Sequence, residues 1–237
     1  MLRRAQYLLI ALFGMWVIAL LCPRTGLATT IIDNISVINP SFEQNVATLT
    51  GSDTHGSWNF SIDGWDISAA NSGGTWLPNG TTFSSPVPQG SYVAFSNGGV
   101  ISQGLGDTIA STGTYTLTVY VGHRNDVWPT VSFPNVPYFI GLFSGATFTG
   151  TNVLVSSYEP VSVGQWKAVT LTYTPSSGDP IGQQLGIFLY SAGIQVDFDK
   201  ISLTRTYEIV PLPTSMLLLG SGLAGLGLLR FRRKKIS

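Results

Sequence analysis

A short segment in the middle of the chain concentrates residue types that recognise ligands. After the strand-like run Thr114–Val121, the chain contains His123, Arg124, Asn125 and Asp126, and Trp128 follows two residues after Asp126. An aromatic ring can stack on a pyranose, while guanidinium, amide and carboxylate groups hydrogen-bond to its hydroxyls. Loops that follow strands often carry such residues. These types therefore predict a sugar-binding loop; the alternative is that Arg124 and Asp126 only stabilise it.

The tryptophans outside this loop divide into two groups. Trp76 stands in a segment rich in Gly and Pro and is a second candidate for stacking on a sugar. Trp65 and Trp166 stand in strand-like runs, and we expect them to lie in the core because large aromatic side chains dominate buried surfaces. Trp76 therefore joins Arg124, Asn125, Asp126 and Trp128 as a candidate ligand-binding residue.

The sequence offers few residues for catalysis. It has two histidines, His55 and His123, and a single cysteine, Cys22, in a segment that we expect to be removed. The motifs of serine hydrolases, zinc peptidases and phosphate-binding loops are absent from the sequence. Asp63 and Asp66 could act as a glycosidase pair, but the spatial separation that decides this cannot be seen in a sequence. We therefore expect a non-catalytic protein, with a glycan-active enzyme as the alternative.

Charge is distributed unevenly along the 237 residues. The formal net charge is zero, yet all 12 acidic residues lie between Asp33 and Glu208, where only four basic residues give a net charge of −8. The other basic residues lie at the two ends. An acidic body excludes a basic nucleic-acid binder, and 27 glycines with 11% aromatic residues favour strands and turns over a helical bundle. One cysteine excludes a disulfide framework and a Cys-based zinc site.

The N-terminal segment has the order of an export signal. Arg3 and Arg4 precede the uncharged run Tyr7–Leu21, and Gly26 and Ala28 are small residues at the third and first positions before a cut. This pattern is typical of a secretory signal peptide. We expect residues 1–28 to be removed after Ala28; an uncleaved signal anchor is the alternative.

The C-terminal segment combines a proline motif, an apolar stretch and a basic cluster. The motif is Pro211, Leu212 and Pro213. The 18 residues Leu212–Leu229 are uncharged, and the basic cluster Arg230–Lys235 follows them. As a helix, this stretch would be about 27 Å long, close to the roughly 30 Å of a bilayer core. The basic residues would stay cytoplasmic. We therefore expect a membrane helix that leaves the acidic body outside.

This ending resembles the PEP-CTERM sorting signal of exported proteins in Gram-negative bacteria. Pro211 and Pro213 match the motif, and Leu212 replaces the usual Glu, as in the Val-Pro-Leu-Pro variant. The resemblance implies an exosortase-type enzyme as partner and removal of the tail at the membrane. It also implies delivery to the cell surface or to an exopolysaccharide matrix.

Period-two alternation predicts strands throughout the body. The clearest runs are Thr114–Val121, Lys167–Tyr173 and Leu185–Tyr190, where apolar residues alternate with polar or small ones. Shorter candidates occur at residues 31–38, 91–96, 138–143 and 152–158. About eight to ten strands without a helical period fit an all-β jelly-roll β-sandwich.

The last strand contains a break in its alternation. Val196 and Phe198 would point to one face, and Ile201 and Leu203 must point to that same face. This requires one extra residue at Asp199-Lys200, so we predict a β-bulge there.

Short motifs at both ends of the body resemble galactose-binding-like jelly rolls, a frame shared by many carbohydrate-binding modules. They are Asn39–Glu43, the dipeptide Gly64-Trp65, and Asp197–Leu203. The resemblance implies a structural Ca²⁺ bound by Glu43 and Asp199, with backbone carbonyls completing the shell. Lys200 replaces an Asp usual in the closing motif. The alternative is that the two carboxylates pair with basic side chains such as Lys200.

Together these features predict three segments: a signal peptide (1–28), an extracellular β-sandwich (29–206), and a sorting and transmembrane segment with a basic tail (207–237). We expect an exported surface or matrix protein that binds glycan or adheres without catalysis. A glycan-active enzyme and a purely structural matrix protein are the alternatives. An exosortase-type enzyme, the membrane and an exopolysaccharide are the expected partners, and nucleic acid is not.

Overall fold

The computed structural model describes residues 27–44, 49–125 and 138–211, and this part of the chain contains strands, turns and bends without a helix. Its contacts divide the chain into two units, Ile32–Tyr207 and a unit made of Met1–Ile31 with Glu208–Ser237. In the second unit only residues 27–31 and 208–211 are described. Within the described ranges, no helix of a length and apolarity that would cross a membrane is found.

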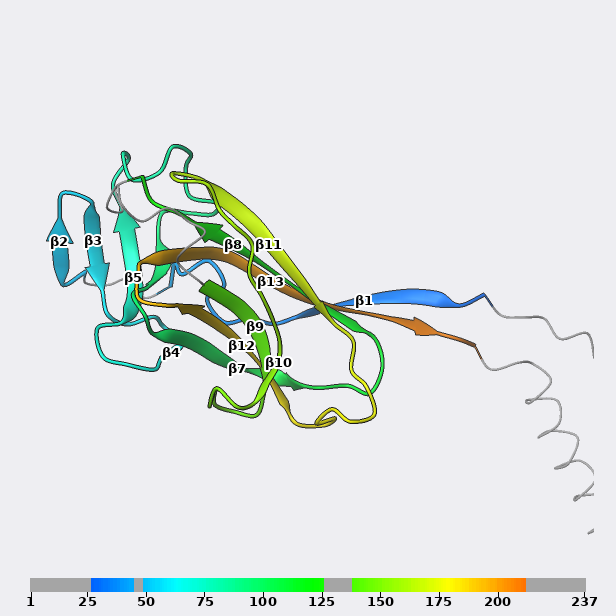
Figure 1. Ribbon diagram of the computed structural model, residues 1–237. Coiled ribbons are helices and arrows are strands. Elements are labelled where there is room, and N and C mark those ends of the chain that lie inside the picture. The colour runs from blue at the N-terminus through cyan, green and yellow to red at the C-terminus, as the bar shows by residue number, and fades with distance from the viewer. Residues whose placement is uncertain (1–26, 45–48, 126–137, 212–237) are drawn as a thin grey trace, which may run out of the picture. The chain divides into compact units, whose positions relative to one another are not determined.

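The strands form two sheets (Figure 1). In chain order they are β1 (Thr29–Ile35), β2 (Gly51–Asp53), β3 (Gly56–Asn59), β4 (Asp66–Ile67), β5 (Gly73–Pro78), β6 (Val93–Ser96), β7 (Val100–Thr108), β8 (Thr114–Gly122), β9 (Tyr138–Ser144), β10 (Val153–Ser157), β11 (Trp166–Tyr173), β12 (Gln184–Ser191) and β13 (Val196–Ile209). The larger sheet has the order β11-β8-β13-β6-β5-β3-β2, with β1 on β13. The smaller sheet has the order β10-β9-β12-β7-β4.

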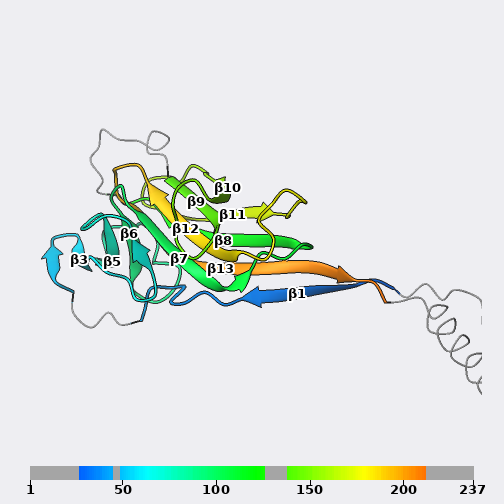
Figure 2. The same ribbon diagram turned by 90° about the horizontal axis from the view of Figure 1, so that it is seen from below.

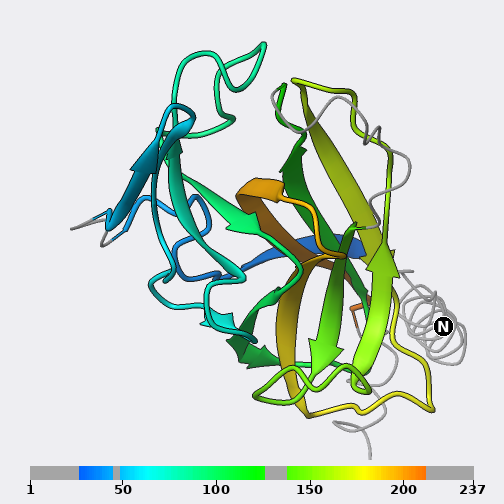
Figure 3. The same ribbon diagram turned by 60° about the vertical axis from the view of Figure 1, so that its left-hand side comes forward.

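The hydrophobic core joins the two sheets. Leu117 and Val119 of β8 and Ile187 and Leu189 of β12 are fully buried in one cluster, so side chains from both sheets pack together. In Figure 3, β2, β3 and β5 (blue to cyan) lie on the left and β9 and β10 (green to yellow-green) lie on the right. Two antiparallel sheets that share a core form a sandwich. The predicted all-β class is confirmed for the described residues.

The clearest sequence patterns became strands at the expected places. The runs 114–121, 167–173 and 185–190 are β8, β11 and β12. The predicted bulge is also confirmed. The pairing of β13 with β8 shifts between Asp199 and Ser202, and Lys200 has a φ of 48°. Ile201 and Leu203 are thereby returned to the core, at 5% and 2% exposure.

Two strands, one in each sheet, lack a clear pattern in the sequence. β5 has the sequence GGTWLP, and its first four residues are all buried. β7 has the sequence VISQGLGDT, whose glycines interrupt any alternation. Strands that are covered on both faces do not alternate, and therefore the period-two rule misses them. Figure 2 shows β3, β5 and β6 gathered at one end of the larger sheet.

The opening motif is bound to the closing strand. The backbone N–H of Ile201 donates to the carbonyl of Pro40 at 2.8 Å, next to the bulge. Phe42 is completely buried, and its ring centre lies 5.7 Å from that of Trp65. Trp65 is therefore a core residue, as predicted. These contacts bring residues about one domain length apart in sequence to the same place.

Candidate functional site

The face of the larger sheet that points away from the core carries a band of aromatic side chains. Residues paired directly across antiparallel strands share a face. Trp58 pairs with Trp76, and Trp76 pairs with Val93. Phe95, two residues from Val93 in β6, pairs with Asp197. Because side chains two apart in a strand point the same way, Trp58, Trp76, Phe95 and Asp197 all lie on this outer face.

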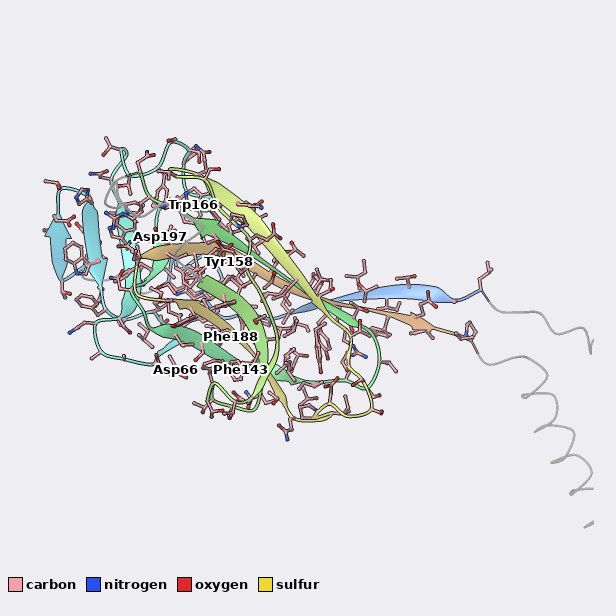
Figure 4. All side chains as sticks on the ribbon, viewed as in Figure 1. Asp66, Phe143, Tyr158, Trp166, Phe188 and Asp197 are labelled. Carbon is pink, nitrogen blue, oxygen red and sulfur yellow. The ribbon has the colours of Figure 1, made fainter. Side chains whose placement is uncertain are left out.

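These rings form a second, smaller hydrophobic cluster. Trp76 and Phe95 are 2% and 4% exposed and pack with Phe83, Trp58 and Trp166. The ring centre of Phe83 lies 4.7 Å from that of Trp166. Trp58 lies directly over the backbone of β2, where a Cβ added at Gly51 would stand 2.3 Å from its ring. Glycine at that position lets the indole lie flat. Figure 4 labels Trp166 and Asp197 on this sheet.

A pocket of about 190 Å³ opens over this cluster. Its wall combines aromatic rings with polar side chains from the β2–β3 hairpin, from β5 and β6, and from the segments that follow β8 and precede β13. The lining residues are Asp53, His55, Trp58, Phe60, Trp76, Phe95, Asn97, Arg124 and Gln195. Phe60 and Phe95 meet edge to face with ring centres 6.0 Å apart. The pocket is therefore an apolar chamber with a polar end.

The polar end is organised around Arg124. Its guanidinium carbon lies 4.4 Å from the ring centre of Trp76, a cation–π contact. Its Nη1 donates to Oε1 of Gln195 at 2.6 Å, and Nε2 of Gln195 donates to Oδ1 of Asp197 at 2.8 Å. Asp197 is fully buried. A chain of contacts thus links an aromatic wall, a cation, an amide and a buried carboxyl.

The β2–β3 hairpin lines the pocket, and its turn is stabilised by the side chain of Asp53. Oδ1 of Asp53 accepts from the backbone N–H of His55 at 2.8 Å and of Gly56 at 3.1 Å. The His55 carbonyl in turn accepts from Thr82 Oγ1 at 3.1 Å. Side-chain bonds of this kind stabilise tight turns. We therefore assign Asp53 to the shape of the pocket, which leaves Asp197 as the carboxyl of interest.

The predicted binding residues separate in the structure. Arg124 and Trp76 come together in the pocket. Asn125 is exposed outside it, with its N–H donating to the Thr82 carbonyl at 2.8 Å. Asp126 and Trp128 lie outside the described residues, as do Leu212 and Pro213 of the sorting motif, while Pro211 is the last described residue.

Several pocket residues were missed by sequence reasoning. Trp58, Phe60, Phe95 and Gln195 stand in short or irregular segments without a recognisable motif. Asp197 was seen only as part of the closing motif. Gln195 and Asp197 are two residues apart, on either side of Val196 at the start of β13. Alternation along the strand therefore indicates that the two side chains share a face, and this spacing was the available signal.

A larger groove of about 470 Å³ follows residues 77–91. Its lining contains no titratable side chain, and the amide of Asn79 is already bonded to Thr54, Thr81 and Thr82. It therefore offers little chemistry compared with the pocket at Arg124.

Glu43 and Asp199 both accept hydrogen bonds from one loop, residues 89–92. Oε1 of Glu43 accepts from the N–H groups of Ser91 and Tyr92, both at 2.7 Å. Oδ2 of Asp199 accepts from the N–H of Gln89 at 2.8 Å. Gly90 between them has a φ of 67°, and a Cβ there would stand 2.3 Å from the Glu43 carboxyl. The loop therefore closes tightly over both carboxylates.

The environment of Asp199 is unfavourable for a lone negative charge. Burial raises the pKa of this carboxyl to about 7, and the nearby charge of Glu43 acts in the same direction. Hydrogen bonds from Gln89 and Lys200 and the charge of Lys200 oppose the rise. A cation would compensate both carboxylates, whose oxygens already accept hydrogen bonds from backbone N–H groups, and carboxylate oxygens are among the ligands that Ca²⁺ takes. Among the described residues, no group of three or more acidic, His or Cys side chains could hold a metal. Backbone oxygens and water would have to supply the remaining ligands.

His123 is buried behind the pocket segment. It is 1% exposed, and its Nδ1 lies 3.3 Å from the carbonyl of Val161. Burial lowers the pKa of the imidazole, and the contact with Val161 acts in the opposite direction. The adjacent backbone pairs with Gln165 and Gly164. We therefore assign His123 to the structure of the loop that carries Arg124.

Comparison with known proteins gives one family. Residues 33–204 match the sequence profile of the HpiC1-like family, described as HpiC1 cyclase. No curated protein sequence matches the chain. Among solved structures, an apo cyclase from Fischerella sp. is similar, with 22% identity and a TM-score of 0.58 over 73% of this chain and 96% of that one.

Two similar structures contain bound ligands. A Stig cyclase from Fischerella sp. TAU in complex with (3Z)-3-(1-methyl-2-pyrrolidinylidene)-3H-indole has 22% identity and a TM-score of 0.57, over 74% of this chain and 98% of that one. A cyclase from Fischerella sp. TAU in complex with 4-(1H-Indol-3-yl)butan-2-one has 21% identity and a TM-score of 0.57, over 75% and 100%. At this identity the likeness concerns the fold.

The family match overturns two expectations. The chain was expected to be non-catalytic, with glycan binding or adhesion as its role and a glycan-active enzyme as the alternative; a cyclase family contradicts all of these. The physical reason lies in the pocket. Trp76 is almost fully buried beneath Arg124 rather than exposed as a stacking platform. The loop residue types resembled a sugar site, but the pocket is built by aromatic and polar residues from five segments of the chain.

Proposed function

The chain belongs to the HpiC1-like family of cyclases, and on that premise we propose that it is a cyclase whose active site is the pocket at Arg124. One observation carries the assignment of the site. The pocket has walls of Trp58, Trp76 and Phe95, and the fully buried carboxyl of Asp197 pairs across the sheet with Phe95. Ring closure through cationic carbon needs both a proton donor and surfaces that stabilise positive charge.

The chemistry proposed is an isomerisation, so it needs no oxidant or reductant. A carboxylic acid gives its proton to one π bond of the substrate, which leaves a cationic carbon. A second π bond of the same molecule attacks that carbon and forms the ring. A neighbouring carbon then releases a proton to the carboxylate, and the acid is restored. Positioned acids and bases accelerate such steps by about 10²- to 10⁴-fold.

The residues of the pocket can be assigned to these steps. We assign the proton transfer to Asp197, which is fully buried and is not part of the pocket lining, but which accepts a hydrogen bond from the lining residue Gln195. The face of Trp58 stabilises the cation, since tryptophan has the strongest cation–π interaction. Trp76 already makes such a contact with the guanidinium of Arg124. The apolar wall excludes the water that would otherwise capture the cation.

The proposed substrate is a compact aromatic molecule with an unsaturated side chain. Two similar cyclases were solved with indole-containing ligands. An indole ring would lie between the aromatic walls of this pocket, and a side chain with a double bond would reach its polar end.

The proposal is tested with the full chain and a panel of indoles that carry unsaturated side chains. We expect a product of unchanged mass with one additional ring by NMR. Asp197→Asn should lower kcat by about 10²- to 10⁴-fold and leave binding of 4-(1H-indol-3-yl)butan-2-one within a few-fold. Arg205→Ala, whose guanidinium lies over Tyr207, is the control. No product from any substrate and no binding of the ketone would overturn the assignment.

We also propose a structural Ca²⁺ at Glu43 and Asp199. The buried carboxylate of Asp199, its proximity to Glu43 and the tight loop between them support it. The ion would fasten the opening motif to the closing strand and would not take part in the reaction. Backbone carbonyls and water would complete its shell.

We further propose that the sandwich is a jelly roll and that the cyclase body is exported. The antiparallel sheets with strands that alternate between them support the first point. The basic and apolar N-terminal segment and the proline motif with its apolar and basic tail support the second. An exosortase-type enzyme would process the tail. Detecting the protein in membrane and extracellular fractions, with and without the last 26 residues 212–237, tests export.

A further inference from the structure

The pocket is small for a ligand site. Its volume is about 190 Å³, whereas sites for drug-sized molecules have about 300–1,000 Å³. One side chain accounts for much of the restriction. Arg124 is half-buried, lines the pocket and covers the face of Trp76 with its guanidinium. One of the two indole rings in the wall is therefore covered by the chain's own cation.

Arg124 is held in this position from two directions. The ring of Trp76 lies 4.4 Å below the guanidinium carbon. Oε1 of Gln195 accepts from its Nη1 at 2.6 Å. A guanidinium has donors only, so Gln195 must turn its oxygen to Arg124 and its nitrogen to Asp197, as observed. A single orientation of the Gln195 amide therefore satisfies both Arg124 and Asp197.

The charge of Arg124 is balanced inside the protein. Asp53, which lines the same pocket, contributes an acidic side chain, and Oε1 of Gln195 accepts from one donor of Arg124. An anionic substrate would therefore meet no excess of positive charge. The side chain acts through its volume and its rigid placement.

We propose that Arg124, held by Gln195 on Trp76, is a specificity-determining residue that limits the cyclase to compact substrates. This inference rests on the proposed function, because it treats the pocket as the substrate site. Removing the arginine side chain would expose the face of Trp76 and enlarge the chamber toward Gln195. A bulkier aromatic substrate would then be accepted.

The test compares two probes on the full chain by calorimetry. One is 4-(1H-indol-3-yl)butan-2-one, and the other is the same ketone with a phenyl substituent on its indole ring. We expect the wild type to prefer the smaller probe by about tenfold or more, a typical discrimination by pocket size. Arg124→Ala should reduce this preference to about threefold or less, by tighter binding of the larger probe.

Two further variants separate size from charge. Arg124→Met restores most of the volume without the charge and should restore the preference, while Gln195→Ala should weaken it because the arginine is no longer held. Arg205→Ala removes an equivalent half-buried arginine from Tyr207 and should behave as the wild type. A fold check by circular dichroism accompanies each variant.

The outcomes distinguish this inference from the proposed function. The inference would be overturned if Arg124→Ala kept the wild-type preference for the smaller probe, or if Arg124→Met lost that preference as fully as Arg124→Ala. In either case, binding of the smaller probe would still support the pocket as the site. Failure of the wild type to bind either probe would overturn the proposed site, and the inference with it.

Discussion

The guanidinium carbon of Arg124 lies 4.4 Å from the ring centre of Trp76. Arg124 follows β8, and Trp76 lies within β5, on the other side of β13 and β6 in the larger sheet. The contact therefore links two segments whose strands are separated by β13 and β6 in the order of the sheet. Four consequences of this architecture can be measured.

Trp58→Ala removes one aromatic wall of the pocket. Trp58 is half-buried, so the main loss should fall on the ligand. We expect binding of 4-(1H-indol-3-yl)butan-2-one to weaken about tenfold, since an aromatic pair contributes about 0.5–1.5 kcal/mol beyond its buried area. Calorimetry gives the dissociation constant. Tyr190→Ala removes a half-buried ring from the outer face of the other sheet and should leave binding unchanged; an equal loss in both variants would contradict the site.

Millimolar Ca²⁺ should raise the melting temperature of the full chain, and EDTA should reverse the rise. A ligand at 100 times its Kd stabilises the folded state by about 2.7 kcal/mol. Glu43→Gln should remove most of the shift, because it removes one of the two carboxylates. Glu159→Gln is the matched control, since its carboxylate pairs with Lys167 at 2.7 Å on the surface. Identical melting curves with Ca²⁺ and with EDTA would refute the metal site.

The contribution of His123 to stability should fall as the pH drops below about 6.5, the pKa of an unperturbed histidine, whereas Asp199, whose pKa is raised to about 7, contributes in the opposite direction. Burial lowers the pKa of His123 in the folded chain, so the unfolded chain takes up a proton first. The unfolded state then binds more protons, and the free energy of unfolding decreases as the pH falls toward the folded pKa. Urea midpoints measured across this range should decline less steeply in His123→Gln than in the wild type. Parallel curves for the two proteins would exclude this role.

Gly186→Ala should destabilise the smaller sheet. Gly186 pairs with Phe143, and a Cβ added there would stand 2.2 Å from its ring. Phe143 is fully buried and cannot move away. Figure 4 shows Phe143 and Phe188 on this sheet. Overpacking of this kind costs about 1–3 kcal/mol, which urea denaturation measures. Gly178→Ala, with no atom within 4 Å of its Cβ, should lie within about 0.5 kcal/mol of the wild type.

Some of the fold could be predicted because it depends on local alternation. Tyr115, Leu117 and Val119 of β8 face the core as their spacing requires. The bulge at Asp199-Lys200 followed from the same rule, since two apolar pairs on either side of it had to reach one core. β5 could not be found in this way, because glycines and burial on both faces remove the alternation.

The function could not be derived in the same way. Residue types in the loop at Arg124 suggested a sugar site, and Arg124 and Trp76 were indeed selected, but for the wrong ligand and without their partners. Gln195, Phe95 and Trp58 have no local pattern that marks them.

The sequence by itself determined the all-β class, the positions of the long alternating strands and the bulge, because each depends on which neighbouring residues share a face. Only the tertiary structure decided the pocket. Its walls come from strands that are neighbours in the sheet but distant in the chain, and Gln195 meets Arg124 and Asp197 only after β13 has paired with β6 and β8. A sequence records which groups are present, whereas a site requires their separation and burial in space.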